Sequence, residues 1–342
     1  MASRHRRATL ANVAASAGVS VATVSKVLNG RDDVAPATRA LVQEHLHELD
    51  YVARRARPEL SPAIELCFHG QLSAYHTEVL QGVVEAAADA GVAVVVGVRP
   101  RGPRGAGANR PAAWARALAA AGRQGAIVVA SELAAADLRA LTRARTPVVV
   151  IDPVNLPSAG VTSVGSTNFA GGMLATRHLL DLGHRRVAYL GGPATQACNQ
   201  ARVHGYRGAM EAAGAPVADG YVRMGRFSYE YGLAGGAALL DLPKPPTAVF
   251  AGSDETALGV IEAARGRGLR IPEDLSVVGF DDTPVARLAA PPLTTVRQPL
   301  REMGAVAVRT ALRLAADEPV DSHHVELATE LVVRQSTAAP CA

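Results

Sequence analysis

The sequence predicts a small all-α head joined by a short linker to a larger α/β body with parallel sheets. In the head, apolar residues recur at helical spacing, and hydroxyl-bearing capping residues precede two of the runs. Beyond it, short runs rich in β-branched residues alternate with Ala-rich stretches of helical length. Repeated strand–helix units form parallel sheets, and this part, about 270 residues long, is too long for one sheet.

The composition is that of a packed protein. Of 342 residues, 49% are hydrophobic and 19% charged, which excludes wholesale disorder. The three cysteines, Cys67, Cys198 and Cys341, are too few and too far apart for a disulfide framework or a Cys-x-x-Cys metal site. We therefore expect a reducing, cytoplasmic location. No apolar run approaches the ~20 residues of a membrane helix, and the basic N-terminus lacks the apolar core of a secretory signal. We expect no membrane partner.

Positive charge is concentrated in the first part of the chain. Residues 1–58 hold nine Lys and Arg against five Asp and Glu, whereas residues 59–342 hold 26 of each sign. The whole net charge of +4 therefore lies in the head and linker. A basic module on a neutral body favours binding to a polyanion, although short basic N-termini are often merely solvated.

Three helices are expected in the head, over residues 10–17, 21–28 and 36–49, with Thr9 and Ser20 as caps of the first two. Pro36 is a favourable first residue for the third helix. The expected inward faces are Leu10, Val13, Ala14 and Ala17, then Val24, Val27 and Leu28, and finally Leu41, Val42, Leu46 and Leu49.

The first two helices and their three-residue turn make a helix-turn-helix. Short side chains on the outer face of the second helix allow it to approach base edges closely. Lys26 can reach guanine acceptors, and Val21 and Ala22 can contact a thymine methyl group. The expected DNA-binding residues of the head are Thr9, Ser20, Val21, Ala22, Thr23, Ser25, Lys26 and Asn29. The alternative is an ordinary helical hairpin at the end of an enzyme.

In the body, strands are expected over residues 64–68, 92–98, 126–130, 148–151, 187–190, 248–251 and 276–280. Helices are expected over residues 78–90, 112–121 and 169–182. Asp152 and Asp281 each follow an apolar strand, so they lie at carboxyl ends of strands, where ligand clefts form in parallel sheets.

The chain resembles the LacI/GalR family of bacterial transcription regulators over nearly its whole length. The segments that carry the resemblance include AGVS at 17–20, TVSKVLN at 23–29, LDY at 49–51, HLLDLGHRR at 178–186, PEDLSVVGFDD at 272–282 and PPLTT at 291–295. The resemblance implies a homodimer on a pseudo-palindromic operator. It also implies a two-lobed body similar to periplasmic sugar-binding proteins, with a small effector between the lobes.

On this basis we expect a head over residues 1–51, a basic linker over 52–62 and an effector-binding and dimerisation body over 63–342. Lobe 1 is expected at about 63–160 plus 294–322, and lobe 2 at about 161–293 plus 323–337.

The resemblance places the effector positions on Asp152, Arg202, Phe227, Ser253 and Asp281. Their chemistry suits a sugar: paired carboxylates accept hydrogen bonds from vicinal hydroxyls, an arginine donates in a rigid fork, and an aromatic ring stacks on a C–H face. Alternatively, such carboxylates cap helices and the ring belongs to the core. Further candidates, placed by their nearness to strand ends, are Asn168, His69, Ser73 and Ser131.

The linker departs from the family's hinge-helix pattern, Asn-x-x-Ala-x-x-Leu. Leu60 is in register, but Arg54 and Arg57 replace the Asn and the Ala. Pro58 cannot occupy a helix interior without a clash and a lost hydrogen bond. The alternative is an extended basic strand whose Arg54, Arg55 and Arg57 enter a narrow minor groove.

The expected function is a sequence-specific repressor of sugar-utilisation genes that a small carbohydrate releases from DNA. A nucleobase or nucleoside corepressor is the alternative effector. An enzyme is less favoured, because the sequence has no P-loop, G-x-S-x-G or H-E-x-x-H motif. We expect no catalytic residues, metal or cofactor.

Overall fold

The computed structural model describes residues 9–28, 31, 33–48, 62–69, 72–99, 111–130, 133, 135–155 and 160–341. The chain divides into two compact units, the head up to Leu60 and the body from Ser61 onward. The linker residues Arg54, Arg55, Arg57 and Leu60 lie outside the described residues, as do Asn29 and Ser131.

The head contains α1 (Leu10–Ser16), α2 (Val21–Leu28) and α3 (Pro36–Glu48), as expected. Thr9 caps α1, because its hydroxyl accepts a hydrogen bond from the backbone N–H of Asn12 while the Asn12 side chain accepts one from the Thr9 N–H. These reciprocal bonds satisfy N–H groups that a helix start leaves without partners.

A small apolar core holds the three helices together. Its buried members are Val13, Ala14, Ala17, Val24, Val27, Val34 and Val42. The expectation that Leu41 faces inward is wrong: its exposed fraction is 41%. Successive residues of a helix point about 100° apart, and α3 turns Val42, which was also expected to face inward, into the core. Leu49 lies outside the described residues.

Among the described residues, no single helix is long and apolar enough to cross a membrane. The pair Leu10–Ser16 and Val21–Val27 meets the length and composition test jointly, but its two helices are bent by 102°.

The body contains two six-stranded sheets. The first has the order β11-β5-β4-β3-β1-β2 with parallel pairings, and the second has the order β12-β10-β9-β8-β6-β7, in which β12 pairs antiparallel with β10. The first comprises β1 (Ala63–His69), β2 (Ala93–Arg99), β3 (Arg123–Val129), β4 (Val148–Ile151), β5 (Thr162–Ser166) and β11 (His324–Leu327). The second comprises β6 (Val187–Gly191), β7 (Val222–Met224), β8 (Ala248–Ala251), β9 (Ser276–Asp281), β10 (Thr294–Arg297) and β12 (Glu330–Val332).

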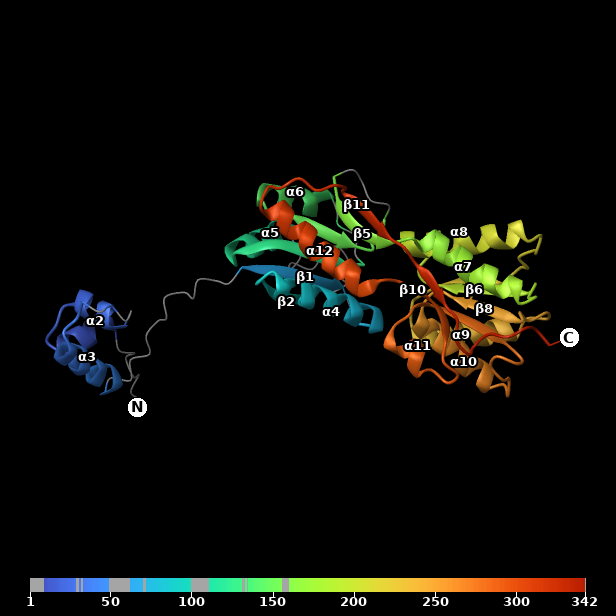
Figure 1. Ribbon diagram of the computed structural model, residues 1–342, viewed down its shortest axis with the longest axis horizontal. Helices are drawn as coiled ribbons and strands as arrows, with labels where there is room; N and C mark the ends of the chain where they lie inside the picture. Colours follow the sequence, from blue (N-terminus) through green and yellow to red (C-terminus); the bar gives the residue numbers. More distant parts are fainter. Residues whose placement is uncertain are drawn as a thin grey trace, which may run out of the picture. The chain divides into compact units, whose positions relative to one another are not determined.

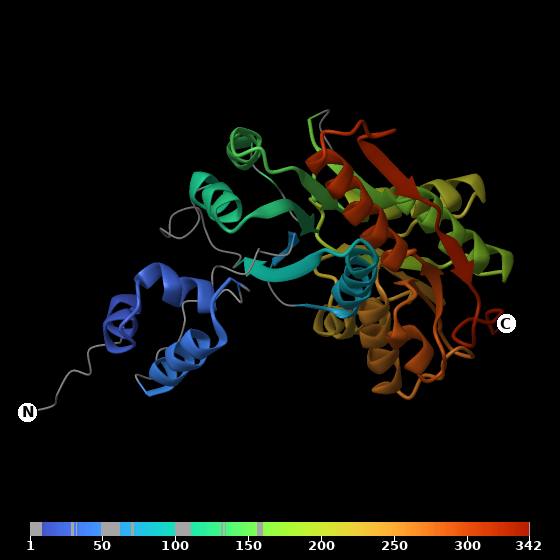
Figure 2. The ribbon, with the colours of Figure 1, turned by 60° about the vertical axis from the view of Figure 1, so that its left-hand side comes forward.

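Helices cover both faces of each sheet, which gives two three-layer lobes (Figure 1). Figures 1 and 2 both show α12 beside α4 on the first sheet. The helices of lobe 1 are α4 (Ala74–Asp89), α5 (Pro111–Ala120), α6 (Ala135–Arg143) and α12 (Leu300–Ala315). Those of lobe 2 are α7 (Asn168–Asp181), α8 (Ala197–Ala212), α9 (Tyr229–Leu240), α10 (Asp254–Arg265) and α11 (Pro284–Leu288). The expected two-lobed α/β body is confirmed.

The chain passes between the lobes three times, between β5 and α7, between β10 and α12, and between β11 and β12, and we call these segments the first, second and third crossovers. The lobe boundaries expected at 160/161, 293/294 and 322/323 are therefore corrected. Strands β5 and β11 belong to the first sheet, and β10 belongs to the second. These short strands are rich in Ser, Thr and charged residues, so no apolar run reveals the sheet to which each belongs.

Candidate functional site

A cavity of about 510 Å³ lies between the lobes, and we call it the interlobe cavity. Its walls come from the start of α4, the residue after β4, α8, the segment before α9, the start of α10 and the end of β9. It therefore opens at carboxyl ends of parallel strands, and its volume lies in the range of about 300–1,000 Å³ that small-molecule sites occupy.

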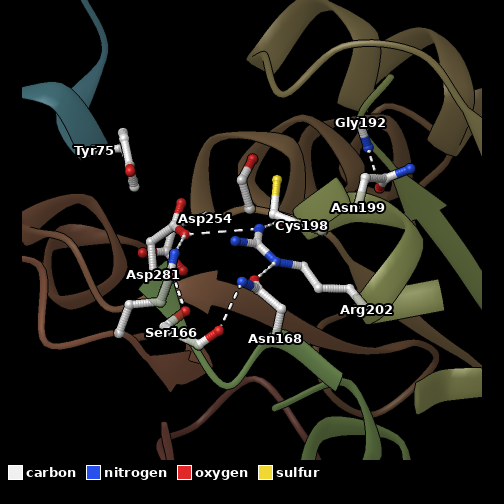
Figure 3. A network of polar contacts seen from close by, with 12 residues as sticks. Tyr75, Ser166, Asn168, Gly192, Cys198, Asn199, Arg202, Asp254 and Asp281 are labelled. Atoms are coloured by element: carbon white, nitrogen blue, oxygen red, sulfur yellow. Dashed lines mark hydrogen bonds and ion pairs between the residues drawn. The ribbon is translucent and has the colours of Figure 1, made fainter. Parts of the chain in front are cut away.

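Arg202 on α8 is the central cation of the cavity, with a side chain that is only 3% exposed. Its Nε donates to Asn168 Oδ1 at 2.7 Å, and its Nη1 donates to the carbonyl oxygen of Gly252 at 2.5 Å. The guanidinium carbon lies 3.8 Å from the centre of the Phe280 ring. Figure 3 shows the guanidinium pointing toward Asn168 and Asp281. Arg202 is thus held rigidly, with one face and one edge fixed by protein groups.

Close packing of α7 on α8 sets the position of this arginine. A Cβ atom added to Gly172 would lie 2.3 Å from the carbonyl oxygen of Arg202, and one added to Gly205 would lie 2.2 Å from that of Phe169. Only glycine fits at both positions, because any side chain would push the two helices apart. The glycines therefore bring Arg202 to the depth at which it meets Asn168.

Asp281 ends β9 and faces Arg202, with 3.9 Å between its Oδ1 and the Arg202 Nη1. The same oxygen accepts a hydrogen bond from Gln298 Nε2 at 2.6 Å. Burial raises the pKa of Asp281 well above its usual value, and Asp254 adds to this effect while Arg202 opposes it. The backbone φ of Asp281 is +115°, which is rare outside glycine and typical of residues held in place for function.

Asp152, directly after β4, is the second expected carboxylate of the cavity. It also has a positive φ, +47°, and it accepts a hydrogen bond from the Tyr75 hydroxyl at 2.5 Å. Burial raises the pKa of Asp152, while the bond from Tyr75 and the charge of Arg202 oppose the increase. Tyr75 thus engages one oxygen of the carboxylate.

Two serines among the expected effector residues line the cavity and also cap helices, whereas Phe227 lines it beside Arg202. Ser253 and Ser73 line the cavity, and each also begins a helix: Ser253 Oγ accepts from the Thr256 N–H, and Ser73 forms a capping box with His76. Phe227 lines the cavity with its ring centre 5.3 Å from the Arg202 guanidinium carbon.

The structure brings most of the expected effector residues together around the cavity: His69, Ser73, Asp152, Arg202, Phe227, Ser253 and Asp281. Asn168 does not line it and instead supports Arg202 from behind. Ser131 lies outside the described residues.

Several lining residues were not expected, among them Tyr75, Cys198, Tyr229, Asp254 and Glu255. Asp254 accepts from the Thr283 N–H, the Thr283 hydroxyl and the Thr295 hydroxyl, and burial raises its pKa to about 7. Its place next to Ser253 in the sequence was the available signal. Glu255 reaches across the cavity, where its Oε1 accepts from the Ala74 N–H at 3.0 Å and so joins the two lobes.

In the head, the outer face of α2 is accessible. Val21 is 47% exposed, Ala22 and Lys26 are exposed, and Thr23 and Ser25 are half-buried. Ser20 caps this helix, since its Oγ accepts from the Thr23 N–H at 3.1 Å. The Lys26 Nζ lies 2.7 Å from Asp33 Oδ2, an ion pair in which both side chains are more than half exposed.

Comparison with known proteins identifies both parts of the chain. Residues 9–53 match the model of the bacterial regulatory proteins of the lacI family, and residues 176–337 match that of a periplasmic binding protein-like domain. The HTH-type transcriptional regulator CelR of Thermobifida fusca is 35% identical over 97% of this chain and 99% of its own length. The chain belongs to the lacI family of bacterial regulatory proteins.

Solved structures of lacI-family proteins agree with the fold. A complex of the transcriptional regulator CelR with cellobiose has a TM-score of 0.73 at 33% identity, covering 96% of this chain and all of the other. The lac repressor dimer bound to operator and an anti-inducer has a TM-score of 0.73 at 28% identity, covering 98% of this chain and all of the other. As a lacI-family member, this chain is a DNA-binding transcription regulator and not an enzyme.

Proposed function

We propose that this regulator is a homodimeric repressor of sugar-utilisation genes, which leaves its operator when a neutral saccharide enters the interlobe cavity. The observation that carries the proposal is the placement of Asp152, Asp281 and Arg202 around one cavity. A polyol both donates and accepts, so its hydroxyls can donate to the carboxylates and accept from the guanidinium. A DNA-binding regulator of this kind works in the cytoplasm.

The charges of the lining favour a neutral ligand. Three buried aspartates, Asp152, Asp254 and Asp281, surround one buried arginine, Arg202. Burial raises the pKa of all three carboxyl groups, which shows that negative charge is disfavoured in this cavity, and an anionic ligand such as a sugar phosphate would add more of it. The similar regulator CelR has been solved with cellobiose, which is neutral. The chemistry gives no comparable support to a nucleobase, whose flat ring has few hydroxyl-like groups to match paired carboxylates.

Operator recognition is assigned to α2. Val21, Ala22 and Lys26 are exposed and available to base edges, while Thr9, Ser20, Thr23 and Ser25 lie where they can contact phosphates. The remaining proposed DNA contacts, by Asn29, Arg54, Arg55, Arg57 and Leu60, rest on the sequence alone.

The test combines a ligand screen with a DNA-release assay. Mono- and disaccharides, including cellobiose, their phosphorylated forms and free nucleobases are screened for an increase in thermal stability of the purified protein. Each hit is then added to the protein on a DNA duplex selected from a random library. A neutral saccharide that stabilises the protein and releases the DNA supports the proposal. Stabilisation by a nucleobase or a phosphorylated sugar alone would overturn it.

A further inference from the structure

A closed circuit of polar contacts connects the interlobe cavity with two of the three crossovers, and Figure 3 labels four of its members, Ser166, Asn168, Arg202 and Asp281. Asp281 Oδ1 accepts from Gln298 Nε2 at 2.6 Å, and Gln298 Oε1 accepts from Ser166 Oγ at 2.5 Å. The Ser166 carbonyl oxygen accepts from Asn168 Nδ2 at 3.0 Å, and Asn168 Oδ1 accepts from Arg202 Nε at 2.7 Å. The Arg202–Asp281 ion pair, 3.9 Å apart, closes the circuit.

The members of this circuit come from both lobes. Arg202 and Asp281 belong to lobe 2 and line the cavity. Ser166 is the last residue of β5 in lobe 1, directly before the first crossover. Gln298 lies in the second crossover, between β10 and α12. Neither Ser166 nor Gln298 lines the cavity, and their exposed fractions are 1% and 3%.

The side chain of Gln298 joins the lobes from within the second crossover. Its amide donates to a carboxylate of lobe 2 with Nε2 and accepts from a hydroxyl of lobe 1 with Oε1. The bond that Oε1 accepts from the Ser166 hydroxyl and the bond that Nε2 donates to Asp281 together fix the direction of the amide. Any rotation of one lobe against the other changes the distance that this amide spans. Because both partners are buried, a broken bond leaves a polar group without water to replace it.

We propose that Gln298 is a positioning residue that couples occupation of the site at Arg202 and Asp281 to the movement of the lobes. A bound saccharide that takes hydrogen bonds at Asp281 shifts this carboxylate, Gln298 follows it, and the change reaches Ser166 at the end of the first sheet. This coupling deepens the proposed function and rests on it for the identity of the ligand.

A double-mutant cycle on the ligand-free protein tests the coupling without a ligand. Gln298→Met keeps the size of the side chain and removes both hydrogen bonds. Arg202→Ala alone should speed amide exchange of Leu300, whose N–H donates to the Gln298 carbonyl oxygen, about tenfold. In the Gln298→Met background, Arg202→Ala should add less than about twofold. Additive effects of the two substitutions would overturn the proposal.

Thr176→Ala is the matched control. Its hydroxyl is equally buried, belongs to α7 and bonds only within its own helix, to the Gly172 carbonyl oxygen, among the described contacts. It should leave the exchange of Leu300 as in the wild type. If Thr176→Ala speeds the exchange of Leu300 as much as Gln298→Met does, the loss of any buried hydrogen bond would loosen the crossover. That result would also overturn the proposal.

A second readout uses cellobiose as the probe. In Gln298→Met, cellobiose should bind within about threefold of its wild-type affinity, yet DNA affinity should change less than twofold on binding, against about 5- to 150-fold for a coupled protein. If cellobiose leaves the wild type on its DNA, the proposed ligand fails, and the double-mutant cycle still decides the role of Gln298. Unchanged DNA release in Gln298→Met would overturn that role.

The conservative variant Gln298→Glu adds a pH profile. Its carboxyl group can donate to Asp281 only while the two carboxyl groups share a proton, so coupling should persist near pH 5.5 and fall near pH 8, about fivefold or more. The pKa of Asp281 also depends on the charges of Arg202, Asp152 and Asp254. These residues are present in the wild type too, so subtracting the wild-type pH profile removes their contribution. A profile equal to that of the wild type would show that the side chain only fills space.

Discussion

In the head, Lys26 forms an ion pair with Asp33. If Lys26 contacts DNA as proposed, binding exchanges this partner for a base or a phosphate. Both side chains are more than half exposed, so water screens the pair and replacing one partner costs little. The ion pair therefore orients the lysine without withholding it from DNA.

We predict that Lys26→Ala weakens binding to the selected duplex by about 1–3 kcal/mol and relaxes base preference at one position of each half-site. Fluorescence anisotropy and footprinting measure both effects. Asp33→Asn breaks the same ion pair but keeps the lysine, so it should bind DNA at least as tightly as the wild type. An equal loss in both variants would show that the pair acts through the fold of the head.

Arg202 and Asp281 should govern the response to the effector. We predict that Arg202→Ala and Asp281→Ala abolish DNA release by the saccharide while DNA binding persists. Each substitution leaves buried polar groups of the ligand and the protein unpaired, at about 1–3 kcal/mol each. Titration calorimetry and gel shift separate the two activities. Arg207→Ala, an exposed arginine on the same helix, serves as control and should respond normally.

Asp254 should make the stability of the body depend on pH. Its pKa is about 7 in the folded protein against 3.8 ordinarily, so the folded state binds its proton more tightly than the unfolded state. The stabilisation is full below pH 3.8 and is lost as the pH rises through about 7.

The matching measurement is the thermal unfolding midpoint from pH 4 upward, compared between the wild type and Asp254→Asn. The asparagine removes the titration while its amide can still bond to Thr283 and Thr295. We predict a flatter pH dependence for the variant and a stability above that of the wild type at pH 8, about one unit beyond the folded pKa. Parallel curves would contradict the prediction.

Among the connecting segments, the linker should act through its charge. The sequence puts Pro58 inside the helix that the family pattern predicts, a position that disfavours a helix, and three arginines lie within four residues. We predict that replacing Arg54, Arg55 and Arg57 with Ala reduces the slope of log affinity against log salt by up to ~3 units, about one for each lost phosphate contact.

Two companion variants test the same linker. Pro58→Ala should leave DNA affinity unchanged or increase it, because it permits a helix. An unaltered salt slope in the triple variant, together with a large loss of affinity on Leu60→Ala, would show that a hinge helix forms despite the proline.

Strands with continuous apolar runs were predictable from the sequence. Strands β1, β4, β8 and β9 are buried on both faces, so their apolar runs stand out. By contrast, β5, β10 and β11 are rich in polar residues, and their pairing partners decide that they are strands. The corrected lobe boundaries follow directly from these three strands.

The cavity was predictable only in part, for a related reason. Asp152 and Asp281 follow apolar strands, and Arg202 rests on the family resemblance. Tyr75 and Gln298 carry no such signal: Tyr75 meets Asp152 from 77 residues away, and Gln298 meets Ser166 from 132 residues away. Contacts between residues so far apart in the sequence depend on the complete fold.

For the assembled protein, we predict a homodimer on DNA. A single head offers too few phosphate contacts for tight binding, whereas two heads match the two halves of a palindrome. Sedimentation of the protein alone and on a palindromic duplex measures this. A stable monomer occupying one half-site would contradict the prediction.

The three crossovers also determine when each part of the chain can complete its fold during synthesis on the ribosome. The head has its own core and can fold once it leaves the exit tunnel, but the first sheet lacks β11, and the second lacks β12, until residues 324–332 have been made. At about 5–20 residues per second, this interval is on the order of 15–50 s. During that time a nascent chain carries a finished DNA-binding module and an unfinished sensor. Polypeptides released early would retain the first and lack the second, so translation must reach the last strands before regulation begins.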